Sequence, residues 1–237
     1  MTDLPVPERA LAIGAHPDDI EFGCGATLAK WAAAGCAVTM LVLTDGSKGS
    51  WDATASTDAL AESRRLEQKA AAAALGARDV QFLDRVDGEL VSGRREQAEV
   101  CAVIRAARPD VVFGHDPWKR YRIHPDHRHA GWITLDAIVA ARDPHFFPEQ
   151  PDPPHRPSRA LLFEAEEIDH HEDVDGWLDA KVASLLAHRS QWRSTMSITD
   201  DGNGREAFVA EVHDDAVRDA HGSDLRVAEA FKLLTDL

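Results

Sequence analysis

The sequence is poor in cysteine, contains a single tyrosine and has no long apolar run. None of its three cysteines belongs to a Cys-x-x-Cys pair, which argues against a disulfide framework or a thiolate zinc site and favours reduced, buried thiols. The longest apolar tract, residues 31–43, is interrupted by Gly35 and Thr39 and is too short to span a bilayer. The first ten residues lack the charged start and the apolar stretch of a signal peptide. We therefore expect a cytoplasmic protein without membrane insertion.

Basic residues never form a run longer than a pair, and the formal net charge is −15, from 26 Lys and Arg against 41 Asp and Glu. This balance argues against binding to nucleic acid or to an anionic membrane surface. It suits a neutral or cationic small-molecule partner, although a solvated acidic surface explains it equally well. Association into a homo-oligomer stays open. The length of 237 residues fits a single domain over residues 1–237 with a substantial core.

Apolar runs alternate with helix-like segments along the chain, in the rhythm of repeated β-α-β units. The apolar runs are continuous, as in strands that are covered on both faces. We predict a Rossmann-like α/β fold, a three-layer sandwich with a mainly parallel sheet. The predicted strands are residues 10–15, 37–44, 79–83, 110–114 and 160–164, and the predicted helices lie near 24–35, 57–75, 94–107, 126–141, 175–189 and 223–235.

The first chemical motif is the sequence AHPDDIE at residues 15–21, directly after the first predicted strand. Because His16 and Asp19 are three residues apart, their side chains can converge on one metal ion at a turn or a first helical turn. Pro17 disfavours helical geometry at His16 and keeps this histidine on the extended side of the turn. Asp18 then points in another direction, where it is free to act as a general base or to cap the following helix.

The second motif is HPDH at residues 124–127, after the predicted strand 110–114. A catalytic zinc ion takes three protein ligands and keeps one position open for water, so the first motif needs one more partner. The second motif offers two histidines, His124 and His127. Asp126 between them would orient a neighbouring imidazole and raise its basicity. Ligand sites of open α/β sheets gather at the carboxyl ends of strands, so we expect both motifs in one metal site.

These motifs resemble the LmbE-like (PIG-L) family of zinc-dependent de-N-acetylases, which includes glucosaminyl-phosphatidylinositol, mycothiol-pathway and bacillithiol-pathway deacetylases. The resemblance covers about the first 190 residues. It is carried by GAHPDDIEFGCGATLAK at residues 14–30, HDPWKRYRIHPDH at 115–127, LTDG at 43–46, RRLE at 64–67, LG at 75–76 and LAHRSQW at 186–192.

The resemblance implies an LmbE-like fold and one Zn²⁺ per chain, bound by His16, Asp19 and His127. It implies Asp18 as the general base, in agreement with the residue spacing. It also implies that His124 acts as the electrophilic or acidic histidine, and a protonated imidazole suits a developing oxyanion.

The residues that contact the substrate are less clearly indicated by the sequence than the metal ligands. The resemblance places Arg64 at the family's sugar-binding arginine, with Arg65 as the competitor and an exposed, salt-bridging arginine as the alternative for both. It places Asp87 at an acidic residue that binds sugar hydroxyls, although Asp-Gly is also an ordinary turn. Tyr121 is expected to stack on a sugar ring, with Trp118 as the alternative. Mycothiol-pathway deacetylases carry a tyrosine two residues before the first histidine of the second motif, where this chain has Arg122. Close identity with that subgroup is therefore not expected.

The favoured function is a zinc-dependent hydrolase that removes an N-acetyl or similar N-acyl group from an N-acetylglucosamine-type amino sugar or its conjugate. One alternative is an amidase or deacylase acting on a thiol conjugate or a secondary metabolite. A nucleotide-binding module without catalysis is disfavoured, because no Gly-x-Gly-x-x-Gly follows the first predicted strand.

Two segments carry no regular pattern. Residues 46–56 are rich in Gly, Ser and Thr and predict a mobile loop beside the site. Residues 143–158 hold six prolines and predict a long excursion that either covers a cleft or serves as a plain connector. The tail after residue 194 suggests no function.

Overall fold

The continuous apolar runs form the centre of a seven-stranded sheet with the strand order β3-β2-β1-β4-β5-β7-β6. The structure is a computed structural model that describes residues 2–237. Strands β1 to β5 run parallel, whereas β7 is antiparallel to both of its neighbours, β5 and β6. The strands are β1 (Arg9–Gly14), β2 (Ala37–Thr44), β3 (Asp79–Arg85), β4 (Val111–His115), β5 (Arg159–Phe163), β6 (His170–Asp173) and β7 (Ala228–Leu234).

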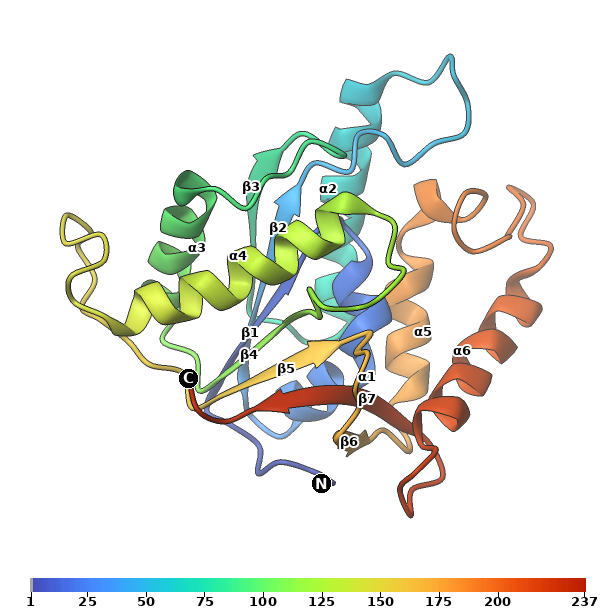
Figure 1. Cartoon of the computed structure of the whole chain (residues 1–237). Helices are drawn as coiled ribbons and strands as arrows, with labels where there is room; N and C mark the ends of the chain where they lie inside the picture. Colours follow the sequence, from blue (N-terminus) through green and yellow to red (C-terminus); the bar gives the residue numbers. More distant parts are fainter. Residues whose placement is uncertain (1) are drawn as a thin grey trace.

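Helices cover both faces of this sheet (Figure 1). Two of them, α3 (Arg94–Ala107) and α4 (Pro125–Arg142), pack against each other on one face. The opposite face is covered by α1 (Asp19–Ala33), α2 (Thr57–Ala74) and α5 (Leu178–Leu186). Outside them, α6 (Arg205–Asp219) packs on α5 and β7, and the short 3₁₀ helix η1 (Arg189–Gln191) follows α5. The predicted three-layer α/β fold is therefore confirmed.

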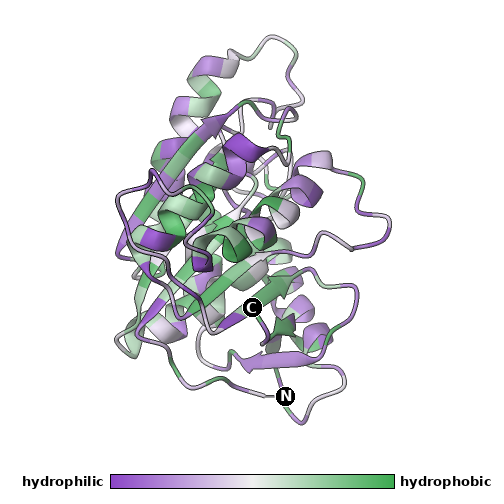
Figure 2. Cartoon of the chain, turned by 60° about the vertical axis from the view of Figure 1, so that its left-hand side comes forward, coloured by the Kyte–Doolittle hydropathy of each residue, from purple (hydrophilic) through white to green (hydrophobic). Residues whose placement is uncertain are grey.

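Each face of the sheet has its own apolar core, and the central strands are among the most hydrophobic parts of the chain in Figure 2. Adjacent residues of one strand serve different cores, as Leu11 packs with the α3–α4 layer and Ala12 packs with the α1 layer. This explains why the strand sequences are continuously apolar instead of alternating.

The chain order in the sheet reverses between β1 and β4, which lie side by side. In open α/β sheets the loops that follow two such strands lead to helices on opposite faces of the sheet, which leaves a crevice for a ligand at the carboxyl ends of the strands. Residues 15–19 follow β1 and His115 ends β4, so the topology brings both chemical motifs to one edge of the sheet.

Helix α1 is broken at Cys24, whose φ of −153° is not helical. The break gives the second half of α1 its own amino terminus, where the backbone N–H groups of Ala26 and Thr27 donate to the Glu229 carboxylate (3.0 and 2.8 Å). Lys181 of α5 pairs with the same carboxylate (Nζ–Oε1 2.7 Å). One buried glutamate of β7 therefore ties α1 and α5 to the sheet.

The carboxyl-terminal part differs from the sequence prediction. The predicted helix near 223–235 is wrong, because Ala228–Leu234 pairs with β5 and β6 as strand β7. Its Ala, Glu, Lys and Leu residues favour a helix intrinsically, but pairing on both edges outweighs this preference. Helix α6 and the short strand β6 were not predicted.

The predicted irregular segments are loops, but they differ in position. Lys48, Gly49, Ser50 and Trp51 from the first segment line the main cavity. No residue of 143–158 lines it, and this segment lies beyond the carboxyl end of α4. No helix in the described part of the chain is both long and apolar enough to cross a membrane.

Candidate active site

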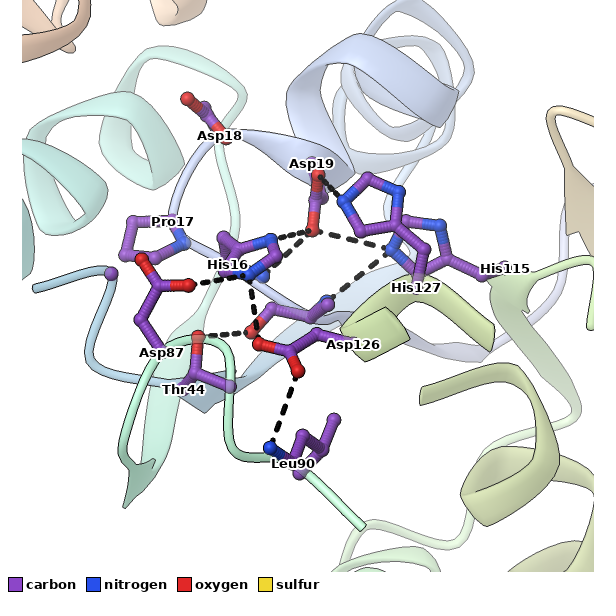
Figure 3. A network of polar contacts seen from close by, with 12 residues as sticks. His16, Pro17, Asp18, Asp19, Thr44, Asp87, Leu90, His115, Asp126 and His127 are labelled. Carbon is purple, nitrogen blue, oxygen red and sulfur yellow. Dashed lines mark hydrogen bonds and ion pairs between the residues drawn. The ribbon is translucent and has the colours of Figure 1, made fainter. Parts of the chain in front are cut away.

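A tight turn after β1 sets the direction of the first motif. A Cβ atom on Gly14 would lie 2.9 Å from Ile20 Cγ1, so the turn and the start of α1 pack closely against this glycine. Asp18 has a φ of 102°, which is rare outside glycine. As Figure 3 shows, Asp19 points toward the histidine cluster, whereas Asp18 points away from it. The predicted divergence of the two carboxylates is therefore present.

Asp19 lies between the histidines of both motifs. Its Oδ2 is 3.2 Å from His16 Nδ1, and its Oδ1 is 3.3 Å from His127 Nε2. The rings of His16 and His127 have centroids 5.2 Å apart, and the His124 ring is 4.6 Å from His16. The structure thus brings together all three predicted metal ligands and the predicted electrophilic histidine.

Within the described residues, donor atoms that lie within 4.8 Å of one another form three groups: His16, His124 and His127; Asp19, His115 and His127; and His16, Asp87 and Asp126. Imidazole nitrogens and carboxylate oxygens are the donors that Zn²⁺ and similar divalent ions take in catalytic sites. The donor set therefore fits a divalent metal ion.

Asp126 and Asp87 hold the far side of the His16 ring. Both carboxylates lie 3.1 Å from Nε2 of His16. Asp126 is fixed by the backbone N–H groups of Gly88 (2.6 Å) and Leu90 (3.2 Å). Burial alone would lower the pKa of His16, but the hydrogen bonds with Asp126 and Asp19 raise it well above its usual range. The imidazole that Asp126 orients is that of His16, and Asp87 contacts the same ring nitrogen.

Two further residues of the cluster were missed at the sequence level. His115 is buried and lies with Nε2 3.3 Å from Asp19 Oδ2 and Nδ1 3.4 Å from Glu164 Oε2. Glu164 also lies 3.6 Å from His127 Nδ1 and pairs with Arg122 (2.8 Å). Burial raises the pKa of Glu164, but the hydrogen bonds with His115 and His127 outweigh it and bring the pKa to about 2. Their position at the carboxyl ends of β4 and β5 is the one feature of the sequence that could have indicated these two residues.

Asp18 faces a different set of groups. Its Oδ2 is 3.2 Å from Nη2 of Arg64, which also donates to the carbonyls of Pro17 and Gly46. Burial raises the pKa of Asp18 to about 6, although the positive charge of Arg64 opposes this shift. A carboxylate with a pKa in this range exchanges protons readily near neutral pH.

A cavity of about 760 Å³ opens over the cluster. Its wall includes both predicted motifs, the loop after β2, and residues of α5, α6 and β7. The predicted site residues in its wall are His16, Asp18, Asp19, Arg64, Asp87, His124 and His127. Asp126 lies behind His16, fully buried. Tyr121 is 89% exposed and is not part of the cavity wall, so its role in substrate binding stays a prediction.

Comparisons with known proteins agree with this geometry. The family model of PIG-L, GlcNAc-PI de-N-acetylase, matches residues 11–138. The diacetylchitobiose deacetylase of Thermococcus kodakarensis is 35% identical over 190 residues, which cover 78% of this chain and 70% of that protein. The N,N'-diacetylchitobiose deacetylase of Pyrococcus horikoshii, solved with its inhibitor MPG, has a TM-score of 0.87 at 27% identity and is matched over 97% of this chain and 84% of its own.

A 1D-myo-inositol 2-acetamido-2-deoxy-alpha-D-glucopyranoside deacetylase of Kineococcus radiotolerans is 35% identical over 169 residues, but the match spans 58% of this chain and only 46% of that protein. These relatives are all deacetylases, which hydrolyse N-acetyl amide bonds. The family model covers more than half of the chain, and its match includes both motifs that meet at the ends of β1 and β4. The chain therefore belongs to the PIG-L family of GlcNAc-PI de-N-acetylases, as the two motifs indicated.

Proposed function

We propose that this protein is a zinc-dependent hydrolase that removes an N-acetyl group from an N-acetylglucosamine-type amino sugar or its conjugate. The observation that carries the proposal is the Asp18 carboxylate, which points away from the converging donors of His16, Asp19 and His127 and lies in the wall of the same cavity. The identity with the archaeal diacetylchitobiose deacetylase supports the choice of an amino sugar.

We assign the metal to His16, Asp19 and His127, with one Zn²⁺ per chain. When bound, zinc would supply an activated water and polarise the acetyl carbonyl. Asp126 and Asp87 keep the His16 ring oriented by contacting its Nε2. A site of this composition leaves a coordination position for water.

The remaining steps belong to the side chains around the metal position. Asp18 accepts the proton of the attacking water and can return it to the departing amine. His124 faces the cavity beside His16, and burial together with the His16 charge lowers its pKa, which opposes the protonated form that the sequence suggested. The N–H of its neutral ring would donate a hydrogen bond to the oxyanion. The Arg64 charge opposes the rise in the Asp18 pKa, and Arg64 lies in the cavity wall, where it can also contact a sugar hydroxyl.

The proposed partner is a small molecule, with no role for nucleic acid. The net charge of −15 supports this choice. We also propose a cytoplasmic location, supported by the free, buried thiols of Cys24, Cys36 and Cys101, which suit a reducing compartment. We also propose that residues 1–237 form a single domain and that the protein self-associates.

The test is acetate release from N,N'-diacetylchitobiose and from N-acetylglucosamine by the zinc-loaded protein, with the EDTA-treated protein as control. We expect zinc-dependent release of acetate together with a free amine. Zinc-loaded protein that releases no acetate from either sugar, but hydrolyses a thiol-conjugated amide in the same assay, would favour the amidase alternative. Inactivity on all of these amides at full zinc occupancy would overturn the proposal.

A further inference from the structure

The backbone at Asp18 adopts a conformation that its own side chain does not stabilise. Its φ of 102° and ψ of −27° are left-handed, and its carboxylate makes no capping hydrogen bond to α1. Non-glycine residues keep such a conformation only when their surroundings impose it, and they concentrate at functional sites. The group that holds this turn therefore also sets the direction of the Asp18 carboxylate.

Gln68 of α2 contacts this turn directly. The backbone N–H of Asp18 donates to Oε1 of Gln68 (3.0 Å), and Nε2 of Gln68 donates to Oε1 of Glu21 (2.5 Å). A peptide N–H can only donate, so Gln68 must turn its amide oxygen to Asp18, and this leaves its NH₂ group for Glu21. One helical turn earlier, Arg64 fixes the same segment through the Pro17 carbonyl and the Asp18 carboxylate.

Gln68 cannot reach a substrate. Gln68, Glu21 and His188 have no exposed surface, and none of them is part of the cavity wall. The second oxygen of Glu21 has no hydrogen bond, and its neighbour His188 lies 3.7 Å away. Burying polar side chains costs free energy, whereas apolar side chains could fill the same space without that cost. The presence of these three polar residues therefore indicates a specific role.

We propose that Gln68, supported by Glu21, is a positioning residue for the hydrolysis. It holds the Asp18 peptide in its left-handed conformation and so aims the Asp18 carboxylate into the cavity. This inference rests on the proposed function, because it assumes that Asp18 is the general base.

The test compares Gln68→Leu with the exposed neighbour on the same helix, Lys69→Leu, as matched control. We expect Gln68→Leu to lower kcat about 100-fold, the scale of a misplaced catalytic group, with KM and zinc stoichiometry nearly unchanged. Lys69→Leu should keep both constants. A Gln68→Leu enzyme that folds, binds zinc and keeps its kcat would overturn the proposal.

A donor–acceptor exchange separates positioning from simple packing. Gln68→Glu alone sets a carboxylate against Glu21 and should lose activity. Combining it with Glu21→Gln restores an acceptor for the Asp18 N–H and a donor at position 21, so kcat should recover by about tenfold over Gln68→Glu. These assays belong well above pH 6, so that Asp18 stays ionised in every variant. If Gln68→Leu fails to fold, the exchange variants decide whether Gln68 positions Asp18. A double variant that folds and binds zinc but does not recover kcat would contradict the proposal.

The parent enzyme distinguishes the two possible failures. If the unmodified, zinc-loaded protein releases no acetate from the N-acetylated sugars, the proposed function fails. If the parent is active but the Gln68 variants equal it in kcat, only the positioning role fails.

Discussion

Asp126 Oδ2 lies 3.1 Å from Nε2 of His16, a residue 110 positions earlier in the chain. The same carboxylate accepts the backbone N–H groups of Gly88 and Leu90, so it is fixed before any metal arrives. Carboxylates in this position orient a ligand imidazole and increase its basicity.

We expect Asp126→Asn to weaken zinc binding by roughly 10- to 100-fold, the usual effect of removing such a partner. Titration with a competing chelator measures this affinity. Circular dichroism of the zinc-free variant checks that the fold persists. An unchanged zinc affinity would mean that Asp87 alone suffices to orient His16.

Asp18→Asn should keep the metal, because Asp18 points away from the histidine cluster. Its hydrolysis rate should fall by about 100-fold or more, as expected for the loss of a general base. Zinc stoichiometry and acetate release are measured on the same sample. A variant that loses zinc would make Asp18 a ligand, and a variant with full activity would exclude it as the base.

His127→Ala should lose zinc, since it removes one of the three proposed ligands. His129→Ala is the matched control, two residues further along α4. The His129 ring is turned to Ser92, with Nδ1 3.2 Å from its backbone nitrogen and 3.1 Å from its hydroxyl. Metal analysis after dialysis should find zinc only in the His129 variant. Full zinc occupancy in His127→Ala would refute the ligand assignment.

Arg64→Met should shift the acid limb of the pH–rate profile to higher pH. Burial raises the pKa of Asp18, and the Arg64 charge opposes that rise. Without this charge the carboxylate stays protonated to a higher pH, and the protonated form cannot act as a base. The measurement is kcat/KM from pH 4.5 to 8. A limb that stays in place, or moves to lower pH, would mean that another group controls it.

Glu229→Ala should destabilise the fold by roughly 3 kcal/mol, because it leaves the Lys181 ammonium, whose side chain is only 11% exposed, without its carboxylate partner. It also removes the acceptor of the Ala26 and Thr27 N–H groups at the break in α1. Urea unfolding measures the free energy of unfolding. The exposed Glu149→Ala should change it by less than about 0.5 kcal/mol.

Sequence reasoning was effective where the signal is local. The runs of β1, β2, β4 and β5 are mostly apolar, and the spacing within residues 16–19 and 124–127 already places donors on one side of a turn. His115 ends β4 and opens the segment 115–127 that carries the resemblance, but no spacing marks it as a site residue, and Glu164 is a single polar residue after β5. Only the pairing of β4 with β5 brings Glu164 next to His115 and His127.

The antiparallel edge was missed for a related reason. Strand β6 has the sequence HHED, and its charged or polar side chains give no strand signal. Its Glu172 is nevertheless fully buried, because it accepts from the backbone of Leu4 and pairs with Lys30 (2.8 Å each). These partners lie far away in sequence, so no local window contains the information.

The place of β7 between β5 and β6 has a consequence for biosynthesis. A growing chain contains the complete proposed metal-binding set once residue 127 has emerged from the ribosome. At that stage the walls contributed by α5, α6 and β7, such as Lys181, Phe208 and Ala228, do not yet exist. Strand β6 can pair with β7 only after α5 and α6, which lie between them in the sequence, have been synthesised. The proposed metal ligands are therefore all synthesised well before the substrate cavity can close, and we expect the long-range pairing of β7 with β5 and β6 to be a slow part of folding.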